Sequence, residues 1–319
     1  MTVIKSLAFC NKNKLKNLKS FVDSELDLSV FHSFPVDILH HFLPFECKFL
    51  NESYVAMENK NITGLLTIKK TSQKKVKITR LLLEENSVQS GKLLINYVVT
   101  TFLSKGAESF YIIVNKENYP VLKMLTGDCN FRDAAKETIY KIEKKELAQG
   151  NDEMNFEHIR KMKFSDIKSI LELINSNMPA YQKTTFYKTK SEIKDRFLKN
   201  PQKFILYNKN PNNLIGYFSV LELTKKSFLL DFVLQNTYEA YVIDIIKYVK
   251  AVLTKNNDFQ TLYIRLNGYY SNFKELCEIL DMEYKNSSES RILVKDFLVA
   301  KNRDYTYERM IFNDATPAF

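Results

Sequence analysis

The same order of strands and helices is predicted on both sides of one polar segment. That segment, Lys144–Asn155, carries Gly150 and lies near the middle of the 319-residue chain. Polar segments with glycine typically join domains, and a repeat of about 150 residues is too long for a solenoid and indicates a duplicated domain. We therefore expect domains at residues 1–145 and 156–297, a linker at 146–155 and a C-terminal tail at 298–319.

Hydrophobic periodicity in the first half predicts strands alternating with helices. The expected strands are Val3–Phe9, Tyr54–Met57, Ile62–Ile68, Val76–Leu83, Phe110–Val114 and Thr138–Ile142. The expected helices are Lys14–Leu26, Ser90–Ser104 and Tyr119–Leu125. The last strand is expected to close the sheet of this half.

The second half gives the same order. Its expected strands are Phe156–Lys161, Lys203–Tyr207, Leu214–Leu223, Phe228–Leu234, Thr261–Leu266 and Arg291–Val294. Its expected helices are Phe164–Asn175, Ser191–Leu198, Tyr238–Leu253 and Asn272–Leu280. Strands and helices mixed in this way predict an α/β chain in which helices flank each sheet.

Composition excludes several classes of protein. Hydrophobic residues make up 45% and charged residues 26%, which are ordinary globular values, and 7 glycines exclude a collagen-like chain. The net charge of +10 is shared by both halves, so it fits a nucleic acid, an anionic lipid, a phosphate-bearing cofactor or a solvated lysine-rich surface.

The cysteines and the apolar stretches indicate a cytoplasmic chain without a membrane span. None of the four cysteines lies in a Cys-x-x-Cys pair, and their spacings do not form a zinc framework. The N-terminus has only a short apolar run, and stretches such as Leu93–Leu103 fall below the ~18 residues that a transmembrane helix needs. We therefore expect reduced thiols, a cytoplasmic location and no membrane partner.

The segment after Val76–Leu83 is suited to bind a phosphate group. It opens a helix, and the free N–H groups and the positive dipole end of a helix N-terminus attract anions. Ser87, Ser90 and Lys92 are compatible with phosphate, and Gly91 would let the backbone approach it closely. A helix N-terminus without any ligand is the alternative.

These elements and motifs resemble the GNAT N-acetyltransferase superfamily in a tandem arrangement. The family's phosphate-binding loop has the motif Gln/Arg-x-x-Gly-x-Gly/Ala. When this motif is aligned with the segment, its three defined positions are Asn86, Gln89 and Gly91, and only Gly91 matches. Asn118 matches the family's Asn-x-x-Ala segment. The resemblance implies two domains, each with a mostly antiparallel mixed sheet, and acetyl-CoA or another acyl-CoA as substrate. The implied cofactor-binding residues are Leu83, Ser87, Val88, Gln89, Ser90, Gly91, Lys92 and Asn118.

Other positions depart from the family pattern. Leu125 stands where the family often has a proton-donating Tyr, with Tyr119 nearby as an alternative that more often packs as an aromatic. In the second half Glu239 falls near the phosphate position, and Cys277 falls near the expected Tyr. We therefore expect the second half to be a degenerate copy that serves as a scaffold or faces the substrate.

Candidate bases stand at the end of Val76–Leu83. Glu84 and Glu85 can take a proton from an amine nucleophile, although adjacent carboxylates at a strand end are also often simply solvated. Asp231, inside an apolar strand, is an outside candidate. The cluster His32, His40, His41 and Cys47 matches no metal spacing, so no metal site is expected.

The sequence therefore predicts a CoA-dependent N-acyltransferase that transfers an acetyl group to an amine of a small molecule or protein, with the cofactor on the first half. A non-catalytic GNAT-like binding or scaffold protein is one alternative. A transferase that uses aminoacyl-tRNA is another, motivated by the positive charge; nucleic acid is otherwise not expected. The observation that bears most on these alternatives is whether the fourth and fifth strands splay apart, because the family admits the pantetheine arm there.

Overall fold

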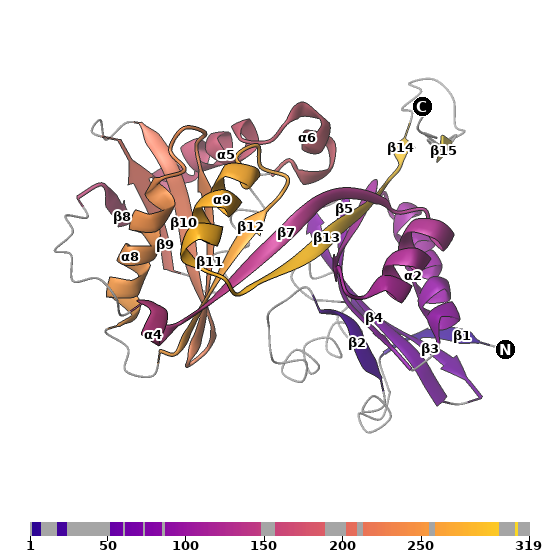
Figure 1. The fold of residues 1–319 in the computed structure, drawn as a ribbon. Coiled ribbons are helices and arrows are strands. Elements are labelled where there is room, and N and C mark those ends of the chain that lie inside the picture. The colour runs from indigo at the N-terminus through magenta and orange to yellow at the C-terminus, as the bar shows by residue number, and fades with distance from the viewer. Residues whose placement is uncertain are drawn as a thin grey trace, which may run out of the picture. The chain divides into compact units, whose positions relative to one another are not determined.

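The structure is a computed structural model of the chain. It describes residues 2–7, 18–23, 52–59, 61–72, 74–84, 87–147, 157–188, 202–208, 213–254, 259–299 and 310–311. These residues form two compact units (Figure 1). The first unit contains the described residues up to Asp133 and those from Ile292 onward, and the second contains Ala134 to Arg291.

The first unit is built on a mixed sheet with the strand order β1-β3-β4-β5-β6-β13. Its strands are β1 (Val3–Ser6), β2 (Lys19–Asp23), β3 (Glu52–Glu58), β4 (Asn61–Ser72), β5 (Lys75–Leu83), β6 (Ser109–Asn115) and residues 292–296 of β13 (Ser287–Asp296), with a small pair β14 (Leu298–Val299) and β15 (Met310–Ile311). Its helices are α2 (Val88–Leu103), α3 (Tyr119–Lys123) and a π-helical turn, Met124–Asp128. Strands β1, β3, β4 and β5 pair antiparallel, whereas β5 and β6 pair parallel.

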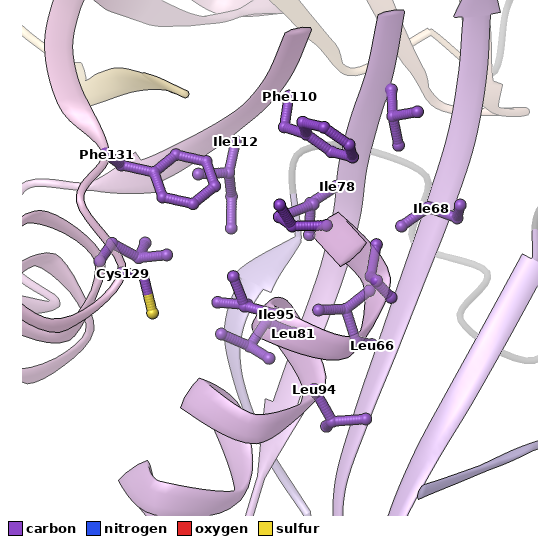
Figure 2. Packing of buried hydrophobic residues seen from close by; sticks show 14 of the residues in the cluster. Leu66, Ile68, Ile78, Leu81, Leu94, Ile95, Phe110, Ile112, Cys129 and Phe131 are labelled. Atoms are coloured by element: carbon purple, nitrogen blue, oxygen red, sulfur yellow. The ribbon is translucent and has the colours of Figure 1, made fainter. Parts of the chain in front are cut away.

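Helix α2 covers one face of this sheet because its apolar residues recur at helical spacing. Its buried side chains include Leu94, Ile95 and Phe102, and they pack against strand residues such as Leu66 and Ile78. Figure 2 shows this core from close by, with Cys129 and Phe131 joining it from the segment after the π-helical turn. Removing this apolar surface from water holds the helix on the strand ends that form the candidate site.

The second unit has a sheet with the order β7-β12-β11-β10-β9-β8. Its strands are residues 134–143 of β7 (Arg132–Glu143), β8 (Ile159–Lys161), β9 (Gln202–Tyr207), β10 (Leu214–Thr224), β11 (Ser227–Leu234), β12 (Thr261–Asn267) and residues 287–291 of β13. Its helices are α4 (Lys144–Leu147), a 3₁₀ turn at Phe164–Asp166, α5 (Ile167–Ser176), α6 (Ala180–Phe186), α8 (Tyr241–Leu253) and α9 (Phe273–Glu283). Only the β11–β12 pair is parallel among these neighbours.

The core of the second unit lies between the sheet and helices α8 and α9. Leu230 and Phe232 of β11 pack there with Ile264 of β12 and Ile245 of α8. Because side chains alternate along a strand, Asp231 faces the other side of the sheet. Helix α5 packs on β10 and β11.

The two closing strands are present, but their pairing differs from the expectation. The strand expected at Thr138–Ile142 is part of β7, which pairs antiparallel with β12 of the second unit. The strand expected at Arg291–Val294 is part of β13, whose residues from Ile292 onward belong to the first unit next to β6. Hydrophobic alternation predicts that a segment is a strand and which face it buries, but it does not identify the sheet edge that the strand joins.

Most other predicted elements are confirmed within two to four residues, and one is wrong. Residues 19–23 form strand β2 where a helix was expected at Lys14–Leu26. The backbone of β2 pairs with β5, and such tertiary pairing overrides a local helical pattern. Helix α6 was not expected, and the helix expected at Ser191–Leu198 lies outside the described residues. The α/β class with a mixed sheet in each unit is confirmed.

Candidate functional site

The junction between β5 and α2 carries the residues predicted to bind a cofactor. The Glu84 N–H donates a 3.0 Å hydrogen bond to the Thr63 carbonyl, which extends the β4–β5 pairing by one residue. The Ser87 N–H donates a 3.0 Å bond to the Glu84 carbonyl, and Ser87 is the N-cap of α2. The Glu84 side chain is exposed, whereas Glu85 lies outside the described residues. Of the two candidate bases, Glu84 is thus placed at the start of the site.

Ser90 and Gly91 face the protein interior. The Ser90 hydroxyl lies 2.8 Å from the Thr63 hydroxyl, and both are buried. A Cβ atom on Gly91 would lie 3.0 Å from Leu83 and 3.2 Å from the Met124 sulfur. Gly91 therefore allows α2 to pack closely on β5 and on the π-helical turn, and Leu83 contributes its side chain to that packing.

The first turn of α2, which is described in full, carries no negative charge of its own. Gln89 is exposed and takes part in α2, so the backbone at this position does not require glycine. Val88 is partly buried, and Lys92 places its Nζ 3.8 Å from Asp128 Oδ1. The first-turn N–H groups, the helix dipole and Lys92 together favour an anion here.

Asn118 lies at the connection from β6 to α3. It is the N-cap of α3, where its N–H donates to the Asn115 carbonyl and its carbonyl accepts a bond from the Leu122 N–H, both at 3.0 Å. The Tyr119 side chain next to it is 69% exposed. The expectation that it packs as a buried aromatic is therefore wrong. Leu125 is fully buried in the core and has no proton to give, whereas the exposed Tyr119 hydroxyl can donate one.

Strands β5 and β6 stop pairing before they end. Their parallel register runs from Lys75 opposite Ser109 to Ile78 opposite Ile112. Both strands then continue, β5 to Leu83 and β6 to Asn115. The two strands therefore separate at the end that leads into α2.

The separated end of β5 pairs with another strand. Strand β2 runs antiparallel to it, with Lys19 opposite Leu83 and Asp23 opposite Arg80. The backbone groups on this edge of β5 are therefore engaged by the chain itself.

The corresponding strands of the second unit leave a pocket where they separate. Strands β11 and β12 pair in parallel as far as Asp231 opposite Arg265. The pocket beyond has a volume of about 210 Å³, counting its mouth open to solvent. Its lining residues are Tyr217, Asp231, Phe232, Val233, Asn267 and Tyr270.

Asp231 belongs to a group of charged side chains on this face of the second sheet. Its Oδ2 lies 4.0 Å from Arg265 Nη1, and Arg265 Nε lies 3.9 Å from Glu137 Oε2. All three side chains are less than one-fifth exposed. Arg265 therefore holds two carboxylates in a partly desolvated place where each needs a positive neighbour.

The end of β11 is fixed by two asparagine side chains. The Leu234 carbonyl accepts bonds of 2.7 Å from Asn177 Nδ2 and 2.9 Å from Asn272 Nδ2. The Ser271 hydroxyl donates to the Asn177 carbonyl at 2.8 Å. These contacts join the start of α9 and the segment after α5 to the strand that lines the pocket.

The N-terminus of α8 differs from that of α2. Glu239 accepts a 3.0 Å hydrogen bond from the Thr237 N–H, and Asp244 lies in the first turn of the helix. Two carboxylates near the positive end of the helix dipole disfavour a phosphate. The anion-binding character is therefore confined, among these two helices, to α2 of the first unit.

Of the described cysteines, Cys129 is buried and Cys277 is partly buried. Burial raises the pKa of the Cys129 thiol to about 11, and burial also raises the pKa of Cys277. Among the described residues, no three His, Cys, Asp or Glu side chains gather to hold a metal ion; His32, His40, His41 and Cys47 lie outside them. No helix in the described part of the chain has the length and apolar character to cross a membrane.

The sequence did not predict how the polar residues of the second unit are grouped. It identified Asp231 but not Glu137, and it noted Arg265 and Asn272 without predicting their contacts with Asp231 and with the Leu234 carbonyl. One pattern could have indicated Arg265: it is the single charged residue of strand β12, just as Asp231 is the single charged residue of β11. The asparagines gave no such signal, because they follow helices and turns where Asn is common.

Comparison with known proteins identifies the fold. The sequence matches no family model and no curated protein. A tandem GNAT protein from the clavulanic acid biosynthesis pathway, solved without acetyl-CoA, superposes with a TM-score of 0.57 at 9% identity over 93% of this chain and 98% of that one. A GCN5-related N-acetyltransferase from Sphaerobacter thermophilus superposes with a TM-score of 0.56 at 8% identity over 82% of this chain and 84% of that one. The chain therefore has the tandem GNAT fold.

Proposed function

We propose that the protein is a CoA-dependent N-acyltransferase whose N-terminal half, residues 1–145, takes acetyl-CoA or another acyl-CoA. The acceptor is an amine of a small molecule or protein. The observation that carries the proposal is the separation of β5 from β6 directly before an α2 N-terminus that has no acidic residue in its first turn. The tandem GNAT fold supports it, because two similar structures are described as a GNAT protein and an N-acetyltransferase.

The residues of this site fit one part of acyl-CoA. The first turn of α2, with Ser87, Gln89 and Lys92, suits the diphosphate, because its N–H groups and a lysine meet it and the turn itself has no acidic residue. Lys92 would exchange its contact with Asp128, at 3.8 Å, for the phosphate. Gly91 acts there through packing. The edge of β5 after Ile78 suits an extended arm only when β2 is not paired with it.

Acyl-CoA would supply an activated thioester carbonyl. The chain's own part is to hold the anionic end at α2 and to take a proton from the incoming amine. Glu84 stands at the end of β5 with an exposed carboxylate, in reach of solvent and of a substrate beside the strand end. Glu84→Gln is expected to lower kcat by about 100-fold and to remove the acidic limb of the pH–rate profile. The control is Glu117→Gln, which changes an exposed carboxylate in a turn of the same unit and should leave kcat and the pH–rate profile unchanged.

A calorimetric titration with acetyl-CoA tests the cofactor. Gln89→Glu places a carboxylate in the first turn of α2, where it stabilises the helix but repels a diphosphate. We expect this variant to weaken binding by about tenfold without lowering the melting temperature. Asn96→Asp makes the same amide-to-acid change about 10 Å along the same helix and is exposed as well, so it should bind like the wild type. Absence of binding at millimolar acetyl-CoA would refute the cofactor assignment.

A GNAT-like protein that binds a partner without catalysis is the second candidate. The pairing of β2 with β5 favours it, because that edge is occupied by the chain. The two candidates differ in one measurement, the formation of an acylated product in a panel of polyamines, amino acids and lysine peptides followed by mass spectrometry. Acylation of any amine excludes the second candidate; binding of acetyl-CoA without product supports it.

A further inference from the structure

Strand β2 occupies the place that opens when β5 and β6 separate. Residues 19–23 pair antiparallel with residues 80–83 of β5, and the register shifts by one residue between Ser20 and Val22. This stretch begins just after Ile78, the last β5 residue that pairs with β6. Strand β2 also contacts β6. The opening in the first unit is therefore filled by a short strand from the same chain.

The second unit shows the same opening without such a strand. Strands β11 and β12 separate after Asp231 and Arg265, and in the described part of that unit no further strand pairs with the end of β11. The pocket lined by Phe232, Val233 and Asn267 lies there instead. Among the described residues, β2 of the first unit therefore has no counterpart beside β11 of the second unit.

A strand edge binds extended ligands through its backbone. Main-chain N–H and C=O groups on a free edge recruit a peptide or another extended amide by forming one more ladder. In the first unit β2 already uses these groups from Arg80 to Leu83. Any extended ligand that enters beside β5 must displace β2 or bind elsewhere.

We propose that β2 is an internal competitor that closes the arm-binding edge of the first unit and must leave β5 before acyl-CoA binds productively. The inference rests on the proposed function, since it concerns the same cofactor. Four residue pairs interrupted by a register shift hold β2, whereas eight pairs join β4 to β5 on the other edge. The short ladder can therefore open while the sheet itself persists.

Hydrogen exchange on the wild-type protein tests the displacement directly. The amides of residues 19–23 should be protected without ligand, and acetyl-CoA should increase their exchange rate while α2 amides become slower. If residues 19–23 stay protected when acetyl-CoA is bound at α2, the proposal is wrong.

A pair of variants tests the competition. Replacing both Ser20 and Val22 by Pro removes two N–H groups and disfavours a paired strand, and replacing both by Ala keeps the backbone able to pair. We expect the proline variant to bind acetyl-CoA at least tenfold more tightly than the wild type, and the alanine variant to match the wild type. Unchanged protection of β4 and α2 amides shows that the proline variant is folded.

The outcomes separate this inference from the proposed function. Equal acetyl-CoA affinity in the wild type and in a proline variant with an exchanging β2 would overturn the competition while leaving the cofactor assignment intact. No acetyl-CoA binding by any of the three proteins, with β2 detached in the proline variant, would overturn the cofactor assignment and this inference with it.

Discussion

A Cβ atom on Gly91 would lie 3.0 Å from Cδ1 of Leu83, closer than packed carbon atoms normally approach. Helix α2 therefore touches the end of β5 at a position that accommodates only a hydrogen atom without rearrangement. Gly91→Val should lower the free energy of unfolding by about 1–3 kcal/mol through overpacking, as measured by urea denaturation.

Gly127 provides the matched control for this substitution. It lies in the π-helical turn with open space where a Cβ would be. Gly127→Val should change the stability by less than about 1 kcal/mol. Equal losses for the two variants would contradict a packing role for Gly91.

The two asparagines on the Leu234 carbonyl are expected to be coupled. Removing either Asn177 or Asn272 leaves the carbonyl one donor, so each Asn→Ala change should cost about 1 kcal/mol. The double variant leaves no side-chain donor on this buried carbonyl, and its cost should exceed the sum of the single costs by about 1 kcal/mol. Chemical denaturation of the four proteins gives the coupling, and strict additivity would show that the two bonds act independently.

The sequence predicted the elements better than their pairing. Alternation and helical spacing place β4, β5, α2 and β11 correctly, because burial of one face dictates those patterns. Which of the two sheets β7 and β13 join depends on which sheet edge is open to pair with them, and local patterns do not record this. Strand β2 was predicted as a helix because Leu15, Leu18 and Phe21 stand near helical spacing, and only its pairing with β5 makes it a strand.

The candidate site shows a similar limit. The position of the α2 N-terminus followed from strand and helix boundaries, whereas Asn118 was singled out by its match to the family's Asn-x-x-Ala segment. The sequence did not predict that Ser90 and Gly91 face inward, because this depends on how close α2 lies to β4 and β5. Asp231 stood out as a charge in an apolar strand, but its neighbour Arg265 required the β11–β12 register.

The Arg160–Asp166 pair should make stability depend on acid pH. Arg160 donates bonds of 2.7 and 2.8 Å to the Asp166 carboxylate and, with a bond from the Lys163 N–H, lowers the pKa of Asp166. Because this pKa is lower in the folded state, the stabilisation is present above the unfolded value of about 3.9 and is lost as the pH falls through the folded pKa.

Asp166→Asn tests this dependence. At pH 7 the variant should be less stable by about 1 kcal/mol, a modest value because Arg160 is about one-third exposed. The difference from the wild type should shrink as the pH falls from about 5 to 2 in denaturation curves. A difference that is constant over that range would show that the charge of Asp166 does not contribute.

Cys129 should resist alkylation in the folded protein. Its pKa of about 11, raised mainly by burial, leaves on the order of 100-fold less thiolate at pH 8 than a free cysteine has. Mass spectrometry after treatment with iodoacetamide should find Cys129 unmodified in native protein and modified in guanidinium. Native modification at the rate of a free thiol would contradict the buried position in Figure 2.

Each closing strand belongs mainly to the unit formed by the other half of the sequence. Phe297 lies near the C-terminus, yet its ring packs edge to face on Phe110 at 6.0 Å and its N–H donates to the Glu108 carbonyl at 2.8 Å. Tyr140 belongs to the first half of the sequence, yet it is fully buried in the second unit and donates a 2.8 Å bond to Asp281. Phe297→Ala and Tyr140→Ala should each cost about 3–5 kcal/mol. Hydrogen exchange should accelerate in α2 for the Phe297 variant and in α8 and α9 for the Tyr140 variant. The reverse assignment, or equal acceleration in both units, would show that the closing strands do not stabilise the units in which they lie.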